Sequence, residues 1–159
     1  MRSCRLVMPK SLKRSRLLYV EDQPGGVAAI EQLIAGRSDL LLLHAASPDL
    51  AIKLARRSRP EVILLNTDPP SIDALAFMQL VRADPAIRST PILALGANAA
   101  PEAMTYALEA GFFHYLVKPI KAEPFIAALE YALEFVARER AEENKFPSRA
   151  GQQLSKESR

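Results

Sequence analysis

Five short apolar runs, each followed by a segment with helical spacing, constrain the fold of this chain more than any other feature. The runs cover residues 16–21, 40–46, 61–66, 91–96 and 113–118. They are apolar along nearly their whole length and lack the polar alternation of a strand with one solvated face. Strands of this kind are covered on both sides. The pattern therefore predicts an α/β fold of five βα units, with a doubly wound parallel sheet and helices on both faces.

The segments between the runs carry signals for helix starts and ends. Ser47 is the expected N-cap of the second helix, with Pro48 at its first position, and Gly111 follows the end of the fourth helix. The final charged turns of the last helix, 137–145, are expected to project beyond the body of the domain. The helices are predicted at 24–36, from 48 onward, and at 72–83, 101–110 and 124–145.

A chain of 159 residues is long enough for one full core and too short for two large domains. The expected division is a leader at 1–15, one domain with an extended last helix at 16–145, and a tail at 146–159. The leader is strongly basic, which can indicate nucleic-acid binding. Because it has no apolar periodicity, a disordered and solvated segment is the preferred interpretation, as it is for the tail, and no nucleic-acid partner is expected.

Membrane insertion and export are not expected for this sequence. The longest apolar run, 40–46, has seven residues, far fewer than the 18 or so that a membrane span requires. The N-terminus lacks the sustained apolar stretch of a signal peptide. A single cysteine, Cys4, cannot form an internal disulfide and suits a reducing compartment. We therefore expect a cytoplasmic protein without a membrane partner.

Polar residues stand at the carboxyl ends of the predicted strands. Glu21 and Asp22 follow the first strand, Asn66 ends the third, Gly96 ends the fourth and Lys118 follows the fifth. In doubly wound sheets a ligand binds outside these strand ends, at the point where the strand order reverses. The residues are therefore expected to meet at one rim of the sheet and to form the functional site.

Four stretches in this order, YVEDQPGG, VILLNTDPPSID, PILALGANA and AGFFHYLVKP, together with the closing amphipathic helix, resemble the receiver domain of two-component response regulators. The resemblance covers about residues 16–136. It implies a CheY-like fold, a flavodoxin-like (βα)5 arrangement. It also implies a role in a phosphorelay, in which a phosphoryl group passes from a phosphohistidine to an aspartate at the end of the third strand, with the help of a divalent cation.

The resemblance assigns a role to each residue at the rim by position. Glu21 and Asp22 correspond to the metal-binding acid pair, and Asp68, through its backbone carbonyl, to a further metal ligand. Lys118 corresponds to the lysine that pairs with the phosphoryl oxygens, and it precedes a proline that is commonly cis in this family. Tyr115 corresponds to the aromatic switch that responds to phosphorylation.

Two central positions depart from the family pattern. Asn66 stands at the phosphoacceptor position, and an amide oxygen is a poor nucleophile because resonance withdraws its electron density. Gly96 stands where the family has a hydroxyl that reads the phosphate. The resemblance is therefore to an atypical receiver, or pseudo-receiver, which is not an enzyme and needs no cofactor, although it can bind Mg²⁺ weakly. Asn66 can also donate a hydrogen bond to Glu21 or Asp22, which an aspartate could not do.

The expected function is phosphorylation-independent docking to a protein partner, either a histidine kinase or a downstream signalling protein. A homodimer would form through the helix at 101–110, the strand at 113–118 and the last helix. Two alternatives stay open: a phospho-competent regulator that uses Asp68 as its acceptor, and a flavodoxin-like protein that binds a small ligand. The proline after Asp68 is expected to turn its side chain away from the acid pair. His44 and His114 are interpreted as structural and not as metal ligands.

Overall fold

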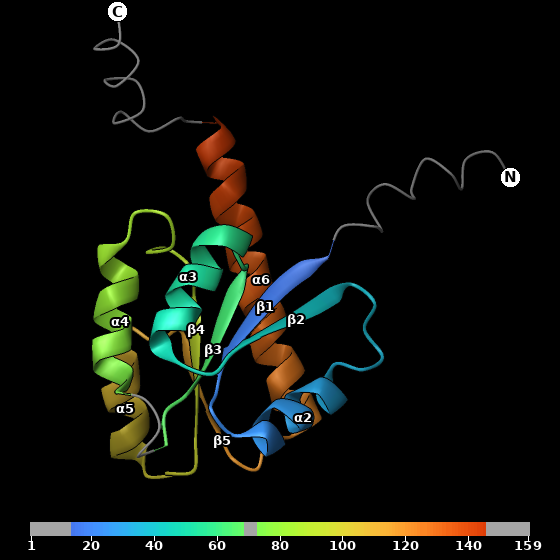
Figure 1. Cartoon of the computed structure of the whole chain (residues 1–159), viewed down its shortest axis with the longest axis vertical. Coiled ribbons are helices and arrows are strands. Elements are labelled where there is room, and N and C mark those ends of the chain that lie inside the picture. Colours follow the sequence, from blue (N-terminus) through green and yellow to red (C-terminus); the bar gives the residue numbers. More distant parts are fainter. Residues whose placement is uncertain (1–13, 69–72, 146–159) are drawn as a thin grey trace, which may run out of the picture.

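The computed structural model describes residues 14–68 and 73–145 (Figure 1). The predictions of a disordered leader and tail fall almost entirely on residues outside these ranges. The five strands are β1 (Ser15–Val20), β2 (Leu40–Ala45), β3 (Val62–Asn66), β4 (Ile92–Gly96) and β5 (His114–Val117). The helices are α2 (Pro24–Leu33), α3 (Pro48–Ser58), α4 (Ala74–Ala83), α5 (Pro101–Glu109) and α6 (Ala122–Lys145).

The strands form one parallel sheet in the order β2-β1-β3-β4-β5. Helices α2 and α6 cover one face of this sheet, and α3, α4 and α5 cover the other (Figure 1). Successive residues of a strand point to opposite faces, so each strand supplies both cores. In β3, for example, Ile63 and Leu65 pack toward α3 and α4, whereas Val62 and Leu64 pack toward α2 and α6. The predicted doubly wound, CheY-like fold is confirmed.

Two helix boundaries lie where the capping residues predicted them, and two others differ from the prediction. The Ser47 hydroxyl accepts a hydrogen bond from the Leu50 N–H at 3.3 Å and caps α3 as predicted. Gly111 follows the end of α5 with a φ of 111°, a left-handed conformation that glycine adopts without strain. The predicted end of the first helix at residue 36 was too late, because α2 ends at Leu33. The last helix begins at Ala122, two residues before the predicted start.

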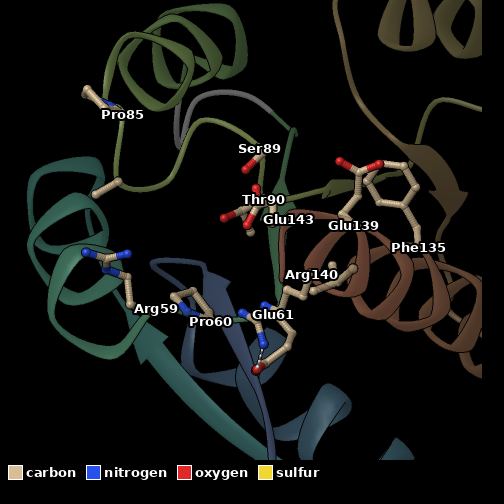
Figure 2. Close-up of a pocket in the computed structure, with 12 residues that line it drawn as sticks. Arg59, Pro60, Glu61, Pro85, Ser89, Thr90, Phe135, Glu139, Arg140 and Glu143 are labelled. Carbon is tan, nitrogen blue, oxygen red and sulfur yellow. Dashed lines mark hydrogen bonds and ion pairs between the residues drawn. The ribbon is translucent and has the colours of Figure 1, made fainter. Parts of the chain in front are cut away.

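The final turns of α6 extend beyond the body of the domain, as predicted, and the side chains of residues 137–143 are exposed (Figure 1), but one of them contacts the residue just before β3. The Arg140 guanidinium forms an ion pair with Glu61 Oε2 at 2.9 Å, and the other oxygen of Glu61 accepts the Arg16 N–H at 2.6 Å. Figure 2 shows this pair at a cleft of about 240 Å³ near the amino ends of the strands. One ion pair thus links the outer part of the helix to the residue that precedes β3. Within the described ranges, no helix is both long and apolar enough to cross a membrane.

Candidate functional site

The carboxyl ends of the strands meet at one rim, where the strand order reverses between β1 and β3. Chain order proceeds from β1 to β2 on one side of this point and from β3 to β5 on the other. Glu21 directly follows β1, Asn66 ends β3, and Lys118 directly follows β5. The structure brings these three side chains and that of Asp68 into one continuous set of contacts.

Asn66 lies at the centre of these contacts and is 3% exposed. Its Nδ2 donates to Glu21 Oε2 at 3.1 Å. Its Oδ1 accepts from Lys118 Nζ at 2.8 Å and from the Asp68 N–H at 3.2 Å. The amide therefore acts as donor on one side and as acceptor on the other. The predicted hydrogen bond from Asn66 to Glu21 is present.

Glu21 is a buried carboxylate, 1% exposed, whose oxygens are satisfied by donors of the chain itself. Its Oε1 accepts the Tyr19 hydroxyl at 3.0 Å, and its Oε2 accepts the Gln23 N–H at 3.0 Å in addition to the amide of Asn66. Burial raises the pKa of Tyr19 well above its ordinary range, and the charge of Glu21 raises this pKa further. The phenol therefore stays protonated and remains a donor to Glu21 at neutral pH.

Asp68 connects the ends of three strands. Its Oδ2 lies 3.0 Å from Lys118 Nζ, and its Oδ1 accepts the Ala97 N–H at 2.8 Å. The side chain is about one-third exposed, at 31%. The proline after Asp68 predicted a side chain that turns away from the acid pair, whereas its partners at the exits of β4 and β5 were not predicted.

Tyr115 and Thr67 fill the space beside Gly96. A Cβ atom placed on Gly96 would lie 2.5 Å from the Tyr115 hydroxyl oxygen and 2.7 Å from Thr67 Oγ1. The Tyr115 hydroxyl donates to the Asn98 carbonyl at 2.9 Å, and burial and, to a lesser extent, the charge of Asp68 raise its pKa. Two hydroxyls from neighbouring residues therefore occupy the space that a side chain at position 96 would fill.

Hydrogen bonds occupy oxygen atoms at the rim that a hard divalent cation would need as ligands. Such ions require several oxygen ligands with available lone pairs. Both Glu21 oxygens face O–H or N–H donors, and the Asn66 oxygen faces the Lys118 ammonium. Among residues 14–68 and 73–145, no three histidine, cysteine, aspartate or glutamate side chains are grouped so as to hold a metal ion. Asp22 is exposed at the rim and is not part of such a group.

The two histidines take different positions. His44 Nε2 lies 2.6 Å from the Glu21 carbonyl oxygen, a contact that requires the proton on this nitrogen because a carbonyl only accepts. His114, at the start of β5, is exposed. The Lys118–Pro119 peptide bond is cis, as the resemblance implied.

Sequence reasoning missed several residues that shape the rim. Tyr19 could have been found, because it lies two positions before Glu21 and residues i and i+2 of a strand share a face. Gly26 carried a weaker signal: a Cβ atom there would lie 2.7 Å from Glu21 Oε1, so the first turn of α2 can approach the carboxylate only without a side chain. Thr67 and Ala97 act through a hydroxyl and a backbone N–H that the pattern did not single out.

A second cleft of about 230 Å³ opens next to the rim, on the side of α4 and α5. Asp68, Asn98 and Tyr115 contribute to its wall, together with more apolar residues.

Comparison with known proteins identifies the relatives of this chain. Residues 17–130 match the family model described as the response regulator receiver domain. The chain is 32% identical over 106 residues to a protein-glutamate methylesterase/protein-glutamine glutaminase of Anaeromyxobacter dehalogenans, covering 65% of this chain and 29% of that protein. It is 30% identical over 132 residues to the transcriptional regulatory protein AfsQ1 of Streptomyces coelicolor, covering 83% of this chain and 57% of that protein.

Solved structures agree with these relatives. The receiver domain of a sensor histidine kinase from Pseudomonas aeruginosa is 29% identical and superimposes with a TM-score of 0.67, covering 76% of this chain and 98% of that one. That structure holds a magnesium ion coordinated in its active-site cleft. The chain spans less than two thirds of the length of the two curated relatives described above.

Proposed function

Because this chain belongs to the response regulator receiver domain family, a module of two-component signalling, we propose that it signals without accepting a phosphoryl group. One observation carries the proposal: the residue at the end of β3 is Asn66, whose amide is occupied on both sides by Glu21, Lys118 and Asp68. An amide in this position offers no anionic oxygen for attack on a phosphorus atom. The module then acts by docking to a protein and not as an enzyme.

The contacts of Asp68 speak against the alternative in which this residue is the acceptor. Its Oδ1 accepts from the Ala97 N–H, and its Oδ2 pairs with the Lys118 ammonium. The oxygens of an incoming phosphoryl group would need hydrogen bonds from these same two groups. A phosphoryl group on Asp68 would have to take over both donors from the carboxylate that they now hold. The other alternative, a small-ligand-binding protein, is favoured by no specific contact in the cleft beside α4 and α5.

Metal binding is proposed to be weak and not required. The relative from Pseudomonas aeruginosa coordinates magnesium, but in this chain the oxygens of Glu21 and Asn66 are turned toward donors. A divalent cation would have to break these hydrogen bonds, one of which includes the buried Tyr19 hydroxyl.

The docking surface that we propose consists of α5, β5 and α6. Large hydrophobic side chains are exposed there, with Tyr106 and Leu108 on α5 and Tyr131 and Phe135 on α6. The partner would be a histidine kinase, a downstream signalling protein or a second copy of this chain. The cytoplasm is the proposed location, since the one cysteine of the sequence suits a reducing compartment.

Phosphoryl transfer is the direct test. The full chain is incubated with acetyl phosphate and Mg²⁺, and its intact mass is then measured by mass spectrometry. We expect no mass gain, whereas a receiver with aspartate at the corresponding position should gain one phosphoryl group under the same conditions. A phosphoryl adduct on the native chain would contradict the proposal, and its loss in Asp68→Asn would assign the adduct to the alternative acceptor.

A further inference from the structure

Two hydrogen-bond donors from separate strand exits point at one carboxylate. The Lys118 ammonium follows β5, and the Ala97 N–H follows β4. They lie 3.0 Å and 2.8 Å from the two oxygens of Asp68. An ammonium and a backbone N–H directed at the same point form a site for an oxyanion, because both bond more strongly to a charged acceptor than to a neutral one. We call this pair of donors the cradle.

A hydrogen bond to Asn66 fixes the backbone from which the Asp68 side chain reaches the cradle. Its own N–H donates to Asn66 Oδ1 at 3.2 Å, a side-chain turn that holds residues 66–68. Asn66 is itself buried and bonded to Glu21 and Lys118. Because Asp68 is tethered this close to the cradle, its effective concentration there is on the order of millimolar or above. A free anion must compete with the carboxylate at that concentration. A free anion of modest affinity would not displace it.

The cradle is connected to Tyr115 through the next residue of the chain. Ala97 is followed by Asn98, whose carbonyl accepts the Tyr115 hydroxyl at 2.9 Å. The same hydroxyl oxygen fills the space beside Gly96, where a Cβ would be only 2.5 Å away. The contact of Asp68 with Ala97 therefore lies one residue from the contact that holds Tyr115.

We propose that Asp68 is a built-in ligand of this cradle, which holds the loop between β4 and α5 together with Tyr115 in one position. The inference rests on the proposed function and extends it to regulation: the chain supplies its own anion at a site that no phosphoryl group reaches. Removal of the Asp68 carboxylate should expose a site for free inorganic phosphate. It should also loosen the loop at residues 97–99.

The test is a titration of the chain of 159 residues with inorganic phosphate, monitored through the NMR chemical shift of the Ala97 amide. Asp68→Ala should bind phosphate saturably and at least about tenfold more tightly than the native chain, since the tethered competitor is gone. The double variant Asp68→Ala/Lys118→Ala should lose this binding. Glu31→Ala, which removes an exposed acid on α2, should behave like the native chain and controls for net charge.

Amide hydrogen exchange supplies a second measurement on the same samples. In Asp68→Ala without phosphate, exchange at Ala97 and Tyr115 should be several-fold faster than in the native chain. Saturating phosphate should slow it again. Exchange in the Glu31→Ala control should stay at the native rate.

Two results would overturn the inference: a folded Asp68→Ala that binds phosphate no better than the native chain, or one whose Ala97 amide exchanges at the native rate. If Asp68→Ala does not fold, the comparison is made with Asp68→Asn, which keeps the shape and removes the charge. Inorganic phosphate does not phosphorylate proteins, so the titration is independent of the acetyl phosphate experiment. A phosphorylated native chain would defeat the proposed function, whereas a failed titration alone would defeat only the built-in ligand.

Discussion

At the level of single residues, the amide of Asn66 has a bonding pattern that a carboxylate could not reproduce. It donates to Glu21 through Nδ2 and accepts from Lys118 through Oδ1. An aspartate would replace the donor with a second carboxylate oxygen about as far from Glu21 Oε2 as the present 3.1 Å. Like charges this close and this deeply buried repel strongly.

Asn66→Asp should therefore destabilise the protein, by about 1–3 kcal/mol near pH 7. The loss should shrink as the pH is lowered, because one carboxyl of the new pair can then take up a proton. Urea unfolding near pH 7 and near pH 5 measures both effects. Gln79→Glu, an amide-to-acid exchange at an exposed residue of α4, is the control and should change little. Equal losses at the two pH values would show that charge repulsion is not the cause.

Gly96→Ala tests whether the space beside Gly96 is filled by the Tyr115 hydroxyl. The new methyl group would lie 2.5 Å from that oxygen, so the ring must move, and we expect a loss of about 1–3 kcal/mol in the free energy of unfolding. In a Tyr115→Phe background the same substitution should cost less, because the obstructing oxygen is absent. A double-mutant cycle by urea unfolding gives the coupling between the two positions. Additive effects would contradict the proposed contact.

The positions at this rim could be predicted because the end of a buried strand is readable in the sequence. Glu21, Asn66 and Lys118 stand where apolar runs stop, and parallel strands bring such ends together. The contacts of Asp68 could not be predicted in the same way. They depend on one side-chain rotamer and on the backbone N–H of Ala97, a donor that any residue except proline would supply.

At the level of elements, the predicted strand limits differ from the observed ones by one residue at most, because a buried parallel strand is a continuous apolar run. Helix ends were harder to place. The ion pair that fastens α6 joins Arg140 to Glu61, residues 79 positions apart in the sequence. No local pattern encodes a contact of this range, so the ion pair of the charged turns was not predicted.

The end of α4 contains a second pair of this kind, between Arg56 of α3 and the buried carboxylate of Asp84. The guanidinium of Arg56, followed by the Ala86 N–H, lowers the pKa of Asp84. A lowered pKa stabilises the fold above the ordinary pKa of aspartate, about 3.9, and this contribution disappears as the pH falls through the folded value.

Asp84→Asn should consequently lower the melting temperature near pH 7 and have less effect as the pH approaches 3. Melting curves across this range test the expectation. Asp49→Asn removes an exposed aspartate from the first turn of α3 and serves as the control. A melting-temperature difference between Asp84→Asn and the native chain that is independent of pH would show that the charge of Asp84 does not contribute.

At the level of the whole molecule, the two faces of the sheet differ in what their helices leave exposed. On the side of α6, Tyr131 and Phe135 lie with Phe113 in an aromatic cluster, with ring centroids 5.3 Å and 5.4 Å from that of Phe113. Tyr131 is 62% exposed. Exposed aromatic residues in a group are typical centres of protein interfaces.

If the proposed homodimer uses this surface, Tyr131→Asp should weaken self-association by about 1.4 kcal/mol or more, which is tenfold in Kd. Sedimentation velocity over a range of concentrations measures the change. Leu50→Asp alters an equally prominent exposed residue on α3, across the sheet, and should leave association unchanged. Equal effects of the two substitutions would place the contact elsewhere, and a native chain that stays monomeric would remove the homodimer from the proposal.

The length of α6 has a mechanical consequence. Its 24 residues span about 36 Å, but its last fully buried side chain is that of Ala132, near the middle. The second half therefore extends past the core, so a tilt of the helix at the docking surface would displace its far end more than its buried half. The ion pair between Arg140 and Glu61 would oppose this displacement, and its loss would let the end of the helix move relative to the sheet.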